Sequence, residues 1–185
     1  MKLTLKETLF LGFCSVFIIS AKAALRLHLK IPGHAMFFTL FFLMIARGSV
    51  PNRLAATFTG LFAGIIAVIL GMGKGGPLMV IKFVLPGLVV DLMALVLPGL
   101  FESVILCVLA GGLAGATRFF SIWLVDFAMG MDPDIVMQHA LIKSTGNILF
   151  GMAGGVAVPV VIRKLRAYGA IPAAVEKKSI ITKKE

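Results

Sequence analysis

One segment of the chain carries a regular series of polar side chains inside an otherwise apolar stretch. His139, Lys143 and Asn147 follow one another at intervals of four within residues 135–162. On an α-helix this spacing places all three on one face. Such a set can hold a small polar or anionic solute, because a lysine is a point-charge partner for carboxylate or phosphate. We therefore predict a solute pocket here; the alternative is that the stripe only bonds neighbouring helices.

Further candidates for the same pocket occur in the preceding apolar stretches. Lys82 lies near the start of one stretch, and Arg118 and Trp123 lie toward the end of another. A tryptophan near the end of a span is first of all an interface anchor. Lys82 can instead pair with Asp126, and Arg118 with an acid of residues 132–134. The predicted substrate-binding residues are Lys82, Arg118, Trp123, Gln138, His139, Lys143 and Asn147.

The composition of the chain that must position these groups is that of a membrane protein. Of its 185 residues, 59% are hydrophobic and 14% are charged. Soluble domains are about 45–50% apolar and about 25% charged. At roughly 20 residues per span, the length allows about six spans with short loops. We expect an all-α membrane protein, a bundle of about six transmembrane helices, with residues 1–165 as one domain and 166–185 as a basic cytoplasmic tail.

Six apolar segments are expected to cross the membrane. They are residues 8–27, 35–46, 54–70, 78–97, 101–125 and 135–162. The second is only about a dozen residues long, which is short for a full span. Pro86-Gly87 is expected to interrupt the fourth. Small residues in the pattern Gly-x-x-x-Gly, beginning at Gly60, Gly111 and Gly151, predict close packing between helices.

The formal net charge is +10, and much of it lies near the two chain ends. Basic flanks on spanning segments fit the positive-inside rule and attraction to anionic lipid headgroups. We therefore expect a multi-pass protein of the cell (inner) membrane, surrounded by lipid bilayer, with both termini and Arg47 and Arg53 on the cytoplasmic side. A nucleic-acid partner is excluded on the same grounds.

The sequence assembles no catalytic set. Cys14 and Cys107 lie in apolar runs and suggest neither a disulfide framework nor a metal site. His28 and His34 flank Pro-Gly and lack the spacing of paired metal ligands. We therefore expect no enzymatic activity, no cofactor and no metal.

A local pattern in the first half of the chain resembles a known family. It consists of Ile31-Pro32-Gly33, a short span, the sequence ARGSVPNR at residues 46–53, and a small-residue span with Gly60 and Gly64. This pattern, together with the size and the six expected spans, is similar to the substrate-binding S components of energy-coupling factor (ECF) vitamin transporters. The resemblance covers about residues 8–165.

The resemblance implies how such a subunit would work. It would capture a vitamin or related micronutrient from outside, dock on a transmembrane coupling subunit driven by two ATPases, and topple to release the solute inwards. The family pocket, built from outer loops and spans four to six, carries over by position onto Lys82, Trp123, His139, Lys143 and Asn147. An alternative function is a non-transporting polytopic membrane scaffold or assembly factor.

The family also implies a docking surface of small residues in the first span. The matching positions here are Ser20, Ala21 and Ala24. Lys22 departs from that pattern. A lysine so near the end of the span can extend outward to the interface.

Overall fold

The computed structural model describes residues 4–28, 33–72 and 76–169, and these form helices without any strand. The elements are α1 (Leu5–His28), α2 (His34–Ser49), α3 (Ala55–Ile69), the 3₁₀ turn η1 (Gly76–Val80), α4 (Ile81–Val96), α5 (Val104–Ala128) and α6 (Pro133–Ala167). The six α-helices correspond to the six predicted segments. Ile31-Pro32 of the family pattern and residues 170–185 of the predicted tail lie outside the described residues.

Four helical segments are long and apolar enough to cross a membrane. They are Leu5–Leu25, Gly76–Val96, Val104–Ala128 and Pro133–Ala167. α2 and α3 are apolar but shorter, with 16 and 15 residues. The prediction of a short second segment is therefore confirmed, and the helices are those of a membrane protein.

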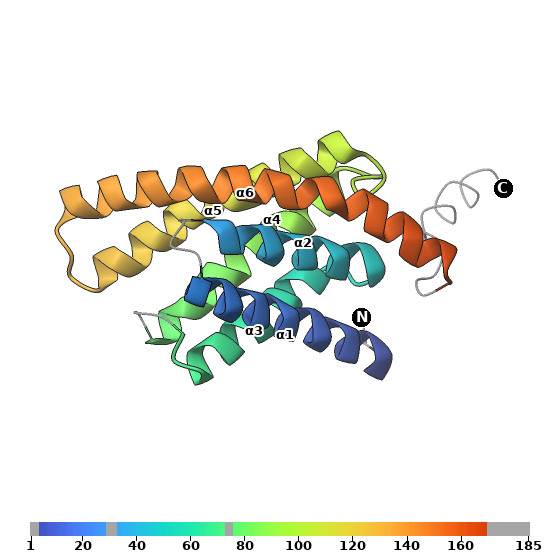
Figure 1. The fold of residues 1–185 in the computed structure, drawn as a ribbon, viewed down its shortest axis with the longest axis horizontal. Coiled ribbons are helices and arrows are strands. Elements are labelled where there is room, and N and C mark those ends of the chain that lie inside the picture. The colour runs from blue at the N-terminus through green and yellow to red at the C-terminus, as the bar shows by residue number, and fades with distance from the viewer. Residues whose placement is uncertain (1–3, 29–32, 73–75, 170–185) are drawn as a thin grey trace.

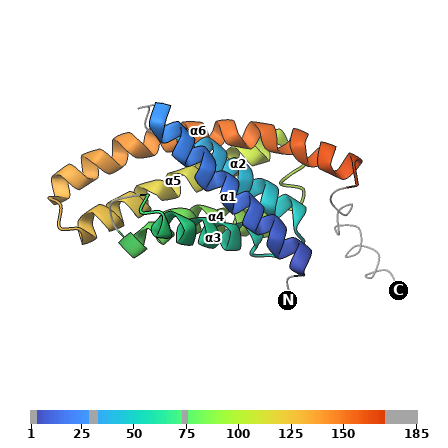
Figure 2. The same cartoon turned by 60° about the horizontal axis from the view of Figure 1, so that its bottom comes forward.

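The helices run back and forth along one long axis (Figure 1). α5 and α6 form an antiparallel pair whose connecting turn projects beyond the other helices, and α2 packs against α6. On the other side, α3 packs against α4 and α1. α1 begins and α6 ends at the same end of the bundle (Figures 1 and 2).

Glycines at the predicted packing positions allow helix backbones to approach closely. Gly60 lies against the carbonyl of Phe83 in α4, and Gly111 against the carbonyl of Gly151 in α6. A Cβ added to Gly115 would lie 2.7 Å from the Asn147 carbonyl oxygen. The predicted close packing is confirmed, because any larger side chain at these positions would push the paired helices apart.

The expected interruption of the fourth span is wrong, because α4 continues through Pro86-Gly87. α4 begins only at Ile81, so Pro86 lies in its second turn and withholds a single intrahelical hydrogen bond. Both residues are buried, and a Cβ on Gly87 would lie 2.6 Å from the Ala56 carbonyl oxygen in α3. Packing against α3 therefore holds the helix together where the local sequence favours a break.

Candidate solute-binding site

The polar stripe of α6 follows the edge of the buried face of that helix. Asp132 caps the helix by accepting a hydrogen bond from the Asp134 N–H at 3.0 Å, and Pro133 follows the cap. Asn147 is buried at 9% exposure, His139 is half-buried and Lys143 is exposed. The three predicted stripe residues therefore meet three different environments along one helix.

A polar contact joins the end of α5 to the start of α6. His139 Nδ1 lies 3.0 Å from Asp126 Oδ2. An ionised carboxylate only accepts hydrogen bonds, so the Nδ1 of His139 carries the proton in this contact. The histidine is thereby fixed in orientation by the aspartate.

Lys82 brings α4 to the same place. It is attracted electrostatically by Asp126 and repelled by Arg118 and by Lys143. The side chain is half-buried. Lys82 of α4 therefore lies within electrostatic range of Arg118 in α5 and of Lys143 in α6, as well as of Asp126, which contacts His139.

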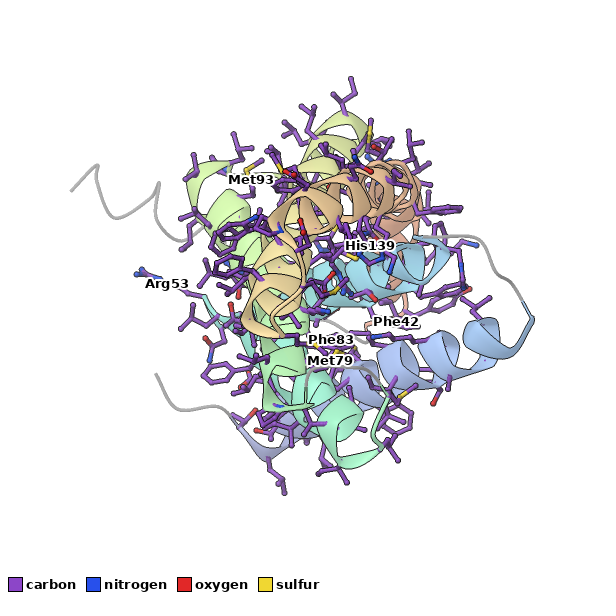
Figure 3. The ribbon with its side chains drawn as sticks, turned by 90° about the vertical axis from the view of Figure 1, so that its left-hand side faces the viewer. Phe42, Arg53, Met79, Phe83, Met93 and His139 are labelled. Carbon is purple, nitrogen blue, oxygen red and sulfur yellow. The ribbon has the colours of Figure 1, made fainter. Side chains whose placement is uncertain are left out.

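Phe83, next to Lys82 in α4, is fully buried. The Nζ of Lys22 lies 4.3 Å from the centroid of the Phe83 ring, and the Cζ of Arg118 lies 5.6 Å from it. Both distances are within the roughly 6 Å range of cation–π attraction. Figure 3 shows Phe83 in the middle of the bundle and His139 on α6 above it. We call this group the Phe83 cluster; it consists of Lys22, Lys82, Phe83, Arg118, Asp126, His139 and Lys143.

The position of Lys22 corrects the expectation that it extends outward. Its ammonium lies over a fully buried ring, so it is directed toward the interior of the bundle. The sequence contained a signal for this inward position. Lys22 is the sole charged residue between Glu7 and Arg26, and an isolated charge within a span is a functional candidate. No comparable signal marked Phe83, since it is one of 15 phenylalanines.

The charges of the Phe83 cluster do not balance. Apart from Lys22, it contains three cationic side chains, Lys82, Arg118 and Lys143, and one carboxylate, Asp126. Arg118 forms no ion pair with Asp132 or Asp134 in the described part of the chain, and its Nε is buried without a hydrogen-bond partner there. The alternative prediction, that Arg118 pairs with Asp132 or Asp134, is therefore wrong. The cluster has an excess of positive charge that a bound anion would offset.

Three predicted site residues lie outside the Phe83 cluster: Trp123, Gln138 and the buried Asn147. Trp123 stacks on Phe127 with ring centroids 5.5 Å apart and faces Phe120 at 6.3 Å, all within α5. Gln138 is exposed. On α1, the predicted docking residues Ser20 and Ala24 are exposed and Ala21 is half-buried.

A second polar centre lies between α2, α3 and α4. Asp91 is 1% exposed and accepts hydrogen bonds from the N–H groups of Ala56 at 3.1 Å and Thr57 at 2.7 Å, and from the Thr57 hydroxyl at 2.7 Å. The Nε of Arg47 lies 3.2 Å from Asp91 Oδ1, as an ion pair without an in-line hydrogen bond. Asp91 thus caps the N-terminus of α3 from another helix. These four residues are the Asp91 centre.

No set of three or more His, Cys, Asp or Glu residues suited to holding a metal ion occurs within residues 4–28, 33–72 and 76–169. Comparisons of the chain with protein-family models, curated proteins and solved structures found no match.

Proposed function

We propose that the protein is a membrane-embedded substrate-capture subunit of an ECF-type importer. It binds a small, anionic, vitamin-like solute from outside and delivers it with a transmembrane coupling subunit and two ATPases. The observation that carries this proposal is the charge excess of the Phe83 cluster. Cations inside a membrane bundle are costly without counter-ions, and they mark solute pathways in many membrane proteins.

The arrangement of the cluster supports capture of a solute rather than attraction of lipid. Lys22 of α1 and Arg118 of α5 lie over an interior aromatic ring, and Lys82 of α4 lies within electrostatic range of Arg118 and of Lys143 in α6. Asn147, also on α6, is buried, and its amide has no hydrogen bond to a described residue. Asn147 lies one helical turn beyond Lys143 on the same face, which would let an anion with a further polar group meet both a cation and this amide.

The overall architecture is compatible with delivery to partner subunits. Six α-helices with both described ends at one end of the bundle fit a subunit with its termini on one side of the membrane (Figure 1). Ser20 and Ala24 present small side chains on α1, and small residues allow a second helix to approach closely.

The second candidate is a non-transporting membrane scaffold or assembly factor. The contact between Asp126 and His139 favours it, because a histidine already bonded to a carboxylate acts as a link between α5 and α6. In a scaffold, substitutions in the polar stripe would lower stability and there would be no solute to lose.

The deciding experiment has two stages. Mass spectrometry of small molecules retained by the detergent-purified protein identifies the solute, and equilibrium binding then gives its Kd. We expect Lys143→Ala to weaken binding by about tenfold, the low end for a charge-assisted hydrogen bond. Asn147→Ala should weaken it by a smaller factor, because a neutral hydrogen bond contributes less.

Arg53→Ala is the control for this experiment. Arg53 is an exposed cation that projects away from the bundle in Figure 3, so its removal should leave Kd unchanged. Unchanged affinity in both Lys143→Ala and Asn147→Ala would sink the site assignment. Loss of thermal stability in these variants, with no solute retained by the parent protein, would favour the scaffold.

A further inference from the structure

A groove on the outside of the bundle has no role in the proposed solute site. Its volume is about 510 Å³. It lies where α2 packs against both α1 and α6, while α1 and α6 do not pack extensively against each other. Its lining is apolar and comes from three helices: Leu9, Phe10, Phe13, Cys14, Phe17, Phe42, Ile45 and Leu165.

The lining follows one face of α1. Leu9 and Phe10 are followed by Phe13 and Phe17 at intervals of three or four residues, and Lys6 lies on the same face one turn before Phe10. Lys6 is exposed, and Glu7 beside it turns back to accept the Thr4 N–H at 2.8 Å. The groove therefore ends, near the start of α1, beside an ammonium with no described partner.

α6 supplies a second ammonium at the same end. Leu165 faces the groove between two basic neighbours, Lys164 and Arg166. Arg166 pairs with Glu102 at 3.1 Å, and Arg163 donates to the Glu102 carbonyl at 2.8 Å. Lys164 is exposed and has no ion pair with any residue that the structure describes. Both arginines are thus engaged elsewhere, and Lys164 is left available.

An exposed tyrosine completes this end of the groove. Tyr168 is 84% exposed and lies three residues, about one helical turn, beyond Leu165. Tyrosine is enriched at the level of lipid headgroups because its ring is apolar and its hydroxyl is polar. This end of the groove therefore combines hydrocarbon walls with an amphipathic ring and two ammonium groups.

We propose that this groove is a binding site for one anionic phospholipid. An acyl chain lies along the phenylalanines of α1, and the headgroup phosphate sits between Lys6 and Lys164. Hydrocarbon burial supplies affinity without headgroup selectivity, and the two ammonium groups supply the preference for negative charge. A partner helix is a weaker fit, because it would cover the apolar walls but leave both ammonium groups without counter-ions.

The test compares two lipids that differ only in headgroup. The detergent-purified protein is mixed with equal amounts of phosphatidylglycerol and phosphatidylcholine carrying the same acyl chains, and retained lipid is counted by native mass spectrometry. We expect phosphatidylglycerol to be preferred by about tenfold or more, since each lysine near a headgroup favours an anionic lipid severalfold. Equal retention of the two lipids would overturn the proposal.

Variants separate the two parts of the site. The double variant Lys6→Gln/Lys164→Gln should lose the preference and keep basal lipid binding. Leu9→Trp, at a position that is 62% exposed, should occlude the groove and lower retention of both lipids. Arg53→Gln, an exposed cation outside the groove lining, should keep the preference.

Two results would refute the site. One is a headgroup preference that survives the double lysine variant. The other is photocrosslinking from position 13, in native membranes, to a membrane polypeptide and to no lipid, which would make the groove a helix-docking surface.

Discussion

The Asp91 centre and the Phe83 cluster are both groups of polar side chains inside an apolar bundle, but they differ in how far their charges are paired. In the Asp91 centre, one carboxylate accepts three hydrogen bonds and faces one guanidinium. In the Phe83 cluster, Lys82 lies within electrostatic range of one carboxylate and two further cations. The Nε atoms of Arg47 and Arg118 both lack a hydrogen bond, but Arg47 has a carboxylate oxygen at 3.2 Å, whereas Arg118 forms no ion pair with a residue that the structure describes.

On the proposed function, the Asp91 centre stabilises the fold and the Phe83 cluster binds the solute. A satisfied polar centre holds helices in one arrangement, since losing any partner leaves a buried group unpaired. An unsatisfied centre costs stability and is retained where a ligand completes it. The two centres should therefore respond in opposite ways to removal of their charges.

The largest effect is expected for Asp91→Ala. This change leaves Arg47 without its counter-ion and removes the cap from α3, so it should lower the free energy of unfolding by about 3–5 kcal/mol. Thermal unfolding in detergent, followed by size-exclusion chromatography, measures it. Asp132→Ala removes an exposed cap of α6 and should cost only about 1 kcal/mol. Equal losses in the two variants would contradict the structural role of Asp91.

The next effect contrasts two arginines. Arg47→Gln should destabilise the protein by about 2–3 kcal/mol, because it leaves the buried Asp91 carboxylate with only neutral partners. Arg118→Gln should leave the ligand-free protein as stable as before, or more stable, because it removes an unpaired buried charge. The same change should weaken solute binding by about 10- to 100-fold. A matching loss of stability in both variants would show that the two centres do not differ.

The sequence predicted the helices well, because apolar segments of spanning length and glycine spacing are local properties. The continuity of α4 through Pro86 could not be predicted, because it depends on burial of Gly87 against α3, a contact between helices.

The site was predictable only in part, for a similar reason. Spacing placed His139, Lys143 and Asn147 on one face, but that face lies at the edge of the packed surface, and spacing alone does not locate that edge. The contacts of Lys22 and Arg118 with Phe83 join residues 35 or more positions apart on three helices. Such contacts are set by how the helices cross, so the local pattern could not reveal them.

The smallest expected effect is the coupling between Phe83 and Lys22, which tests whether the Phe83 ring attracts the cations or only fills space in the core. Phe83→Leu and Lys22→Met, measured singly and together, form a double-mutant cycle for their cation–π contact. We expect a coupling energy of about 1 kcal/mol in thermal unfolding, because the contact lies over a fully buried ring. Phe150→Leu, a comparable change in a partly buried ring of α6, should show no coupling to Lys22→Met. Additive effects of Phe83→Leu and Lys22→Met would mean that the ring only fills space and that the cations are held together by other groups.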